Sequence, residues 1–129
     1  MILGLHHIGI GVKNLEESIQ AYQDILGIEV ESIHDAKDRG RKIAMLSVGN
    51  AKLELVERVE TGGDESHIGR ISHVALQVDD IDKELDALVA KGVRLRDPEP
   101  RQGVSAKRVA WLHPEVMNGV MVELVEKES

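Results

Sequence analysis

The chain has no cysteine and no phenylalanine, and it has only one tryptophan and one tyrosine among its 129 residues. The absence of cysteine excludes disulfides and thiolate metal sites. A metal ion would therefore be held by histidine and carboxylate side chains, which favours a hard or borderline divalent cation. The scarcity of aromatic residues leaves the aliphatic side chains and methionine to build the core.

Positive charge and long apolar segments are also scarce. The formal net charge is −7 and the pI is about 5.3, which argues against a protein that binds nucleic acid or a membrane surface. No apolar run approaches the ~20 residues that span a bilayer, and residues 1–4 lack the features of a signal peptide. We therefore expect a cytoplasmic protein, and its length suits one compact domain.

Residues 5–12 alternate with a period of two and predict a strand. One face is apolar and can pack against a helix. The opposite face carries His7 beside Gly9 and Gly11, so we expect the imidazole to face open space. A histidine in that position suits a metal or substrate site. The alternative is a purely structural histidine.

A helix is expected over residues 15–26. Asn14 is suited to cap it, Glu17 has the spacing of a capping box, and Gly27 is suited to end it. The expected strands that follow are at residues 28–33, 42–48 and 52–56, with a charged loop at 34–40 and a turn at 49–50. These elements form a β-α-β-β-β unit.

A second copy of this pattern follows a linker at residues 60–69. Residues 71–78 repeat the first strand, with His73 and Ala75 on the face opposite the apolar one. Asp79 or Asp80 caps the second helix, which Gly92 ends. The remaining expected strands are at residues 93–95, 108–112 and 120–125, with a long loop at 98–106.

The predicted fold class is therefore α+β, built from tandem βαβββ repeats. We expect one domain, 1–129, made of repeat one (1–59), the linker (60–69) and repeat two (70–129). His67 lies in the linker and is interpreted as a solvated loop histidine.

The last strand of each repeat carries a glutamate between apolar neighbours, Glu54 in the first and Glu123 in the second. Alternation turns both glutamates to the faces that hold His7 and His73. A carboxylate there is unfavourable unless it is paired or metal-bound. A half-exposed sheet with a wet outer face is the alternative. Because all four residues stand at equivalent points of two repeats, we predict that together they hold one divalent metal ion.

Further motifs surround these positions. They are His6-His7-Ile8-Gly9-Ile10, Gly49-Asn50-Ala51-Lys52-Leu53-Glu54-Leu55, Glu99-Pro100-Arg101-Gln102-Gly103, Leu112-His113-Pro114 and Asn118-Gly119-Val120-Met121-Val122-Glu123-Leu124. With them the chain resembles the vicinal oxygen chelate (glyoxalase/bleomycin resistance/dioxygenase) superfamily over essentially its whole length. Within that superfamily the pattern is most similar to the methylmalonyl-CoA epimerases. One departure is residues 42–45, which lack a glutamate that some epimerases carry on the third strand.

The resemblance implies that the repeats form a half-barrel metal-binding cup with a divalent ion, cobalt first, with manganese, zinc or nickel as alternatives. It also implies an acyl-CoA substrate and a homodimer. The implied reaction interconverts (2R)- and (2S)-methylmalonyl-CoA by removing the C2 proton, forming an enolate and returning a proton on the opposite face. The alternatives are a glyoxalase I-type lactoylglutathione lyase and a non-catalytic small-molecule binding protein of the same fold.

In this scheme Glu123 is the first candidate for the acid/base group and Glu54 the second, with a water or His113 as alternatives. The small residues on the ligand faces are expected to leave room for the acyl group. These are Gly9, Gly11 and Ala75. The cations expected near the CoA phosphates are Arg101, Lys107 and Arg108.

Overall fold

The computed structural model describes residues 1–59, 62–103 and 108–128. The chain divides into two compact units. The first-repeat unit is His7–Ser72, and the second-repeat unit is Met1–His6 together with His73–Ser129. Strand β1 (Ile2–Val12) contributes to both units, because its residues up to His6 belong to the second-repeat unit.

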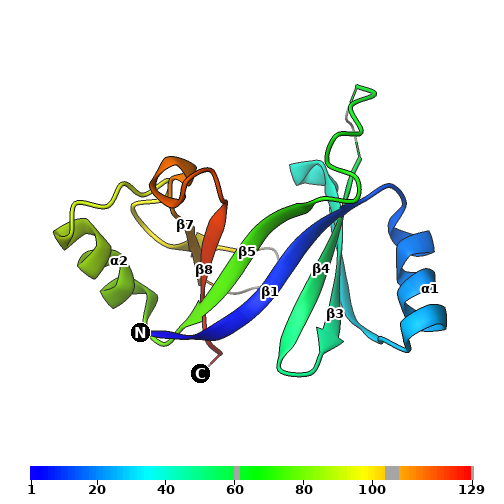
Figure 1. Cartoon of the computed structure of the whole chain (residues 1–129), viewed down its shortest axis with the longest axis horizontal. Helices are drawn as coiled ribbons and strands as arrows, with labels where there is room; N and C mark the ends of the chain where they lie inside the picture. Colours follow the sequence, from blue (N-terminus) through cyan, green and yellow to red (C-terminus); the bar gives the residue numbers. More distant parts are fainter. Residues whose placement is uncertain (60–61, 104–107, 129) are drawn as a thin grey trace. The chain divides into compact units, whose positions relative to one another are not determined.

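The first-repeat unit is a mixed sheet with one helix on it (Figure 1). Its elements after β1 are α1 (Leu15–Leu26), β2 (Val30–Ala36), the short 3-10 helix η1 (Lys37–Arg39), β3 (Arg41–Val48) and β4 (Ala51–Arg58). The strand order is β2-β3-β4-β1. Neighbouring strands run antiparallel except β1 and β4, which are parallel because α1 and two strands intervene in sequence.

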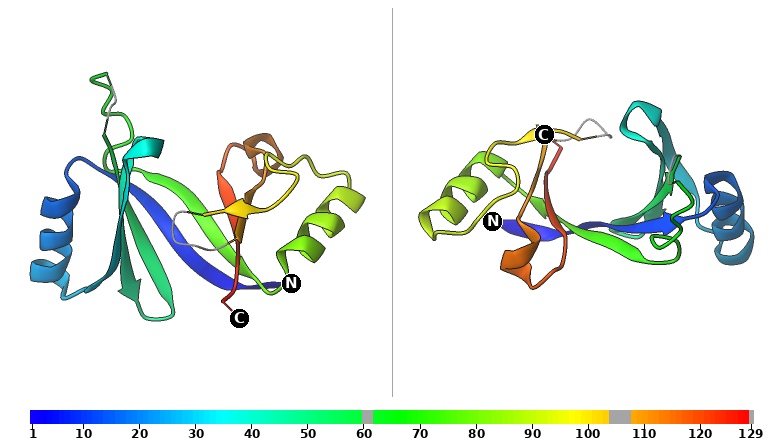
Figure 2. Two further views of the ribbon diagram at one scale, coloured as in Figure 1. Left: turned by 180° about the vertical axis from the view of Figure 1, so that it is seen from behind. Right: turned by 90° about the horizontal axis from the view of Figure 1, so that it is seen from above.

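Helix α1 begins and ends where the sequence predicts. The Asn14 side chain accepts a hydrogen bond of 2.9 Å from the Glu17 N–H, and Gly27 has a left-handed φ of 67°. The helix packs on one face of the sheet, as Figure 2 shows from two further sides, and this face is apolar. The buried cluster between them contains Val12, Leu15, Ala44, Leu46 and Leu55.

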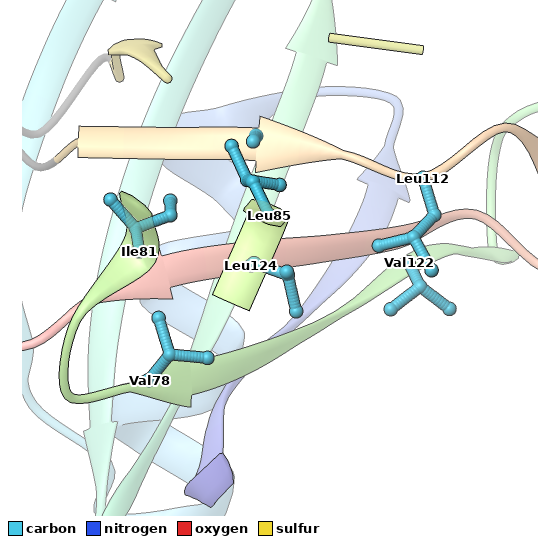
Figure 3. Close-up of a cluster of buried hydrophobic side chains, with 7 residues drawn as sticks. Val78, Ile81, Leu85, Leu112, Val122 and Leu124 are labelled. Carbon is cyan, nitrogen blue, oxygen red and sulfur yellow. The ribbon is translucent and has the colours of Figure 1, made fainter. Parts of the chain in front are cut away.

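The second-repeat unit has the same plan. Its elements are β5 (Ile71–Val78, of which the first two residues belong to the first-repeat unit), α2 (Ile81–Ala90), β6 (Arg101–Gln102), β7 (Arg108–Trp111), the 3-10 helix η2 (Pro114–Met117) and β8 (Val122–Glu126). The strand order is β5-β8-β7-β6. Asp80 caps α2 by accepting from the Lys83 N–H at 3.1 Å. The core between α2 and the sheet is drawn in Figure 3 and contains Val78, Ile81, Leu85, Ala110, Leu112, Val122 and Leu124.

A glutamate at the end of each unit's last strand binds the start of that unit's helix. Glu57 Oε1 accepts from the Leu15 N–H at 2.7 Å, and Glu126 Oε2 accepts from the Ile81 N–H at 3.0 Å. The first N–H groups of a helix have no partner within it, and the helix dipole favours negative charge there. The two repeats therefore share a device that ties helix to sheet.

The α+β class and the tandem βαβββ order are confirmed. The second strand lies two residues later than predicted, and it extends with η1 into the region expected to be a loop. The strand predicted at 93–95 is wrong, since Leu95 makes only an isolated bridge to Leu112. The predicted loop at 98–106 instead contains the short strand β6, which pairs with β7 (Figure 2).

The domain and linker boundaries stay predictions, and residues 60 and 61 of the linker lie outside the described residues. Among the residues that the structure describes, no helix combines the length and the apolar character needed to cross a membrane.

Candidate functional site

In the first-repeat unit, strand pairing brings His7 next to Glu54. The parallel pairing of β1 and β4 sets Gly9 opposite Glu54, and His7 is two residues before Gly9 on the same face. The distance from His7 Nε2 to Glu54 Oε2 is 3.7 Å, and the two side chains are 5% and 16% exposed. The neighbours Leu53 and Leu55 face the other way, into the core under α1.

The second-repeat unit contains the same arrangement. The parallel pairing of β5 and β8 sets Ala75 opposite Glu123, and His73 is two residues before Ala75. The distance from His73 Nε2 to Glu123 Oε1 is again 3.7 Å, with side chains 9% and 10% exposed. The two repeats therefore present one histidine–glutamate pair each, built on the same strand register.

These pairs have the chemistry of metal ligands. A separation of 3.7 Å is too long for an N–H···O hydrogen bond between those atoms. Two ligands that share one ion, each about 2.1 Å from it, lie about 3.0–3.4 Å apart. The observed 3.7 Å is a few tenths of an ångström beyond that range, so a small approach of the two side chains would allow them to share an ion. His7, His73 and Glu123 are buried, so the alternative of a wet outer face is wrong. Their role as ligands stays a prediction.

The expectation of open space around His7 and Gly11 is wrong. His7 is buried, and a Cβ added to Gly11 would lie 2.1 Å from the His67 carbonyl oxygen. The segment 67–70, called the connector below, is held at this position by two backbone hydrogen bonds. The Gly11 N–H donates to the Arg70 carbonyl at 3.0 Å, and the Gly69 N–H donates to the Gly11 carbonyl at 2.8 Å. Glycine is needed at position 11 for this close backbone approach.

His67 is also not the solvated histidine that we expected. Its side chain is half-buried, and its Nδ1 is buried without a hydrogen-bond partner among the described residues. Ala75 likewise does not border an empty space, because it is fully buried with Val109 and Val125. The prediction that Gly11 and Ala75 leave room for an acyl group is therefore wrong.

The cations expected near CoA phosphates have protein partners. Arg108 contacts Asp82 at 3.0 Å and Glu126 at 3.3 Å, and the hydrogen bond to Asp82 is the main cause that raises the pKa of its guanidinium. Arg101 Nε lies 3.5 Å from Asp97. Lys107 lies outside the described residues.

His113 shapes the turn before β8. Its Nδ1 accepts from the Glu115 N–H at 3.2 Å and lies 2.9 Å from the Arg94 guanidinium. The Arg94 group also binds the Glu115 carboxylate at 2.5 Å. These contacts engage the His113 ring in the turn before β8.

Sequence reasoning missed Trp111. Its ring centroid lies 5.0 Å from that of His73, with 70° between the ring planes. The signal was present, because this single tryptophan of the chain falls on the strand before the Glu123 strand. His73 could be named as its neighbour only once the pairings of β7 with β8 and of β5 with β8 were known.

Comparison with known proteins connects this arrangement to one family. The family model of the Glyoxalase/Bleomycin resistance protein/Dioxygenase superfamily matches residues 4–124. A mitochondrial methylmalonyl-CoA epimerase of Dictyostelium discoideum is 37% identical over 132 residues, which cover 95% of this chain and 78% of the relative.

Two solved structures have the same fold. The methylmalonyl-CoA epimerase from Mycobacterium tuberculosis superimposes with a TM-score of 0.89 at 31% identity, covering 99% of this chain and 90% of that one. A variant of the Streptomyces coelicolor methylmalonyl-CoA epimerase, in complex with 2-nitronate-propionyl-CoA, has a TM-score of 0.87 at 27% identity and covers 100% of this chain and 97% of that one. The chain therefore belongs to the Glyoxalase/Bleomycin resistance protein/Dioxygenase superfamily.

Proposed function

We propose that this chain is a metal-dependent epimerase that interconverts (2R)- and (2S)-methylmalonyl-CoA. The observation that carries the proposal is the histidine–glutamate pair built on the same register in each repeat, in a chain whose relatives include methylmalonyl-CoA epimerases. The substrate is accordingly an acyl-CoA thioester, the class of ligand present in the Streptomyces coelicolor complex.

The residues present fit a divalent ion. Two imidazole nitrogens and two carboxylates supply nitrogen and oxygen ligands, and the chain has no thiolate. The ligands that we propose are His7, Glu54, His73 and Glu123, holding one ion between them. Their support is the matched 3.7 Å spacing in the two pairs and the burial of three of the four. Cobalt is the first choice, with manganese, zinc or nickel as alternatives that the same donors accept.

When bound, the ion supplies Lewis-acid stabilisation at the thioester and carboxylate oxygens of the substrate. Glu123 takes the C2 proton on one face of the substrate, and Glu54 is the acid/base group that exchanges a proton with C2 on the opposite face. Removal of that proton leaves a carbanion delocalised into the thioester as an enolate, and a proton returned on the other face gives the opposite configuration. Burial of Glu123 keeps bulk water away from the group that transfers the proton.

We further propose a homodimer of a single-domain, cytoplasmic protein. One family model spans residues 4–124, which supports a single domain. Apolar side chains at the start of β1 are partly exposed, at 47% for Ile2, 43% for Leu3 and 41% for Leu5, and pairing of two chains is one way to cover them. Light scattering should then give twice the 14.2 kDa of one chain. A single species of chain mass at micromolar concentration would contradict the dimer.

The reaction is tested by deuterium exchange at C2 of methylmalonyl-CoA in deuterated water, with and without added cobalt. We expect exchange that depends on the ion, and no comparable turnover of methylglyoxal with glutathione. Turnover of that hemithioacetal without C2 exchange would instead identify the glyoxalase I-type lyase. Inertness toward both substrates, with the ion bound, would reject the epimerase assignment.

A further inference from the structure

Trp111 packs against one of the proposed ligands. The half-buried indole meets the His73 imidazole in an edge-to-face contact, with 5.0 Å between centroids and 70° between planes. In this geometry the positive edge of one ring meets the negative face of the other, which is a preferred arrangement of aromatic pairs. The contact therefore favours the imidazole orientation seen here, with Nε2 3.7 Å from Glu123 Oε1.

The register of β7 and β8 brings Trp111 to the glutamate as well. Trp111 is directly opposite Glu123 in this antiparallel pair. The next pair along, Leu112 and Val122, is joined by a backbone hydrogen bond of 3.1 Å, so Trp111 and Glu123 form a pair of the non-hydrogen-bonded type. Side chains of such pairs lie closer together than those of hydrogen-bonded pairs. Trp111 therefore adjoins both members of the second-repeat pair.

The backbone of Trp111 is held from the side away from Glu123. Its N–H donates to Asp97 Oδ2 at 2.9 Å, and its carbonyl accepts from the Arg96 and Asp97 N–H groups at 3.0 and 3.2 Å. Arg101 Nε lies 3.5 Å from the same Asp97 oxygen. These contacts attach the loop before β6 to the residue of β7 whose ring packs against His73.

At the equivalent position of the first repeat a methionine stands in place of the tryptophan. The residue opposite Glu54 in the pairing of β3 and β4 is Met45, which is buried. A flexible thioether restrains its surroundings less than an indole does. The two histidine–glutamate pairs therefore share the same strand register but differ in the side chain opposite the glutamate, which is an indole in the second repeat and a thioether in the first.

We propose that Trp111 is a positioning residue, which holds the His73 imidazole with Nε2 toward Glu123 so that this pair is preset for a divalent ion. Preorganised ligands lose less side-chain freedom on binding, and the residues that orient them tune affinity. This inference rests on the proposed metal site. It also implies that emission from the single tryptophan of the chain changes when the ion binds.

The test is a titration of the metal-free full chain with cobalt alone, followed by calorimetry and by tryptophan emission. Trp111→Phe keeps an aromatic ring and should bind within about 2-fold of the native chain. Trp111→Leu loses the ring contact and should bind about 2- to 10-fold more weakly, the range expected for an aromatic pair. Met45→Leu is the matched control at the equivalent position and should leave the affinity unchanged.

The emission change should saturate at the same cobalt concentration as the calorimetric signal, and this measurement needs only the native chain. A saturating titration with no change in emission would overturn the inference even if Trp111→Leu fails to fold. Equal affinity of the native chain and Trp111→Leu would overturn it while leaving the metal site in place. No binding of cobalt, manganese, zinc or nickel by the native chain would overturn both the metal site and the role of Trp111.

Discussion

Replacing Gly11 by alanine tests the close approach of the connector to β1. The new Cβ would lie 2.1 Å from the His67 carbonyl oxygen, whereas ordinary contacts begin at 3.4 Å. The obstacle is backbone, so the connector must move. It is held there by the hydrogen bond from Gly11 to Arg70 and the hydrogen bond from Gly69 to Gly11.

The expected change in the free energy of unfolding combines two costs and one smaller gain. Loss of two backbone hydrogen bonds costs about 1–3 kcal/mol, and forcing a methyl group into filled space costs about 1–3 kcal/mol. Alanine also lowers the conformational entropy of the unfolded chain, which raises the free energy of unfolding by about 0.4–1 kcal/mol. We therefore expect Gly11→Ala to lower the free energy of unfolding by about 1–6 kcal/mol.

Urea denaturation measures this loss, and hydrogen exchange locates it. The Gly69 amide, which donates to the Gly11 carbonyl, should lose its protection in Gly11→Ala. Gly49→Ala is the matched control, since that glycine has a φ of 59° and no atom near the new Cβ. It should cost only the ~1–2 kcal/mol of a left-handed alanine.

A second variant separates backbone from side chain. Because the blocking atom is the carbonyl oxygen of His67, His67→Ala should not restore the stability of Gly11→Ala. Full recovery in the double variant would show that the imidazole is the obstacle. Native stability of Gly11→Ala with the Gly69 amide still protected would refute the reasoning altogether.

Three further predictions follow from named contacts. Glu123→Gln should keep the fold and lower C2 exchange of methylmalonyl-CoA about 10²–10⁴-fold, the usual cost of removing a proton-transfer group; exchange at the native rate would contradict its role. Glu57→Ala leaves the Leu15 N–H without its 2.7 Å acceptor and should cost about 1–3 kcal/mol in urea denaturation, whereas unchanged stability would show that the cap is dispensable. Lys42 donates a hydrogen bond to Glu16 at 2.8 Å, and this bond is the main cause that lowers the pKa of Glu16 below its ordinary 4.5. The pair therefore stabilises the fold above pH 4.5. This stabilisation is lost as the pH falls through the lowered pKa of Glu16. In Lys42→Ala the NMR titration of Glu16 should move up toward 4.5, and an unmoved midpoint would refute the assignment.

The sequence alone determined the repeat, the faces of its strands and the capped ends of its helices. Alternation with period two is a local property, so it could assign His7 and Glu54 to one face without knowledge of the fold. The capping of α1 by Asn14 and its end at Gly27 are equally local. Comparison of the two halves then marked Glu123 as the counterpart of Glu54, and the strand pairings set both glutamates in the same register.

Only the tertiary structure decided what surrounds those residues. The connector covers Gly11, and Trp111 reaches His73, through contacts between segments that are distant in sequence. The contact of Trp111 with His73 depends on the pairings of β7 with β8 and of β8 with β5, which a strand pattern does not specify by itself. The path of an irregular connector depends on which carbonyl and N–H groups it finds as partners, and only the folded chain supplies them.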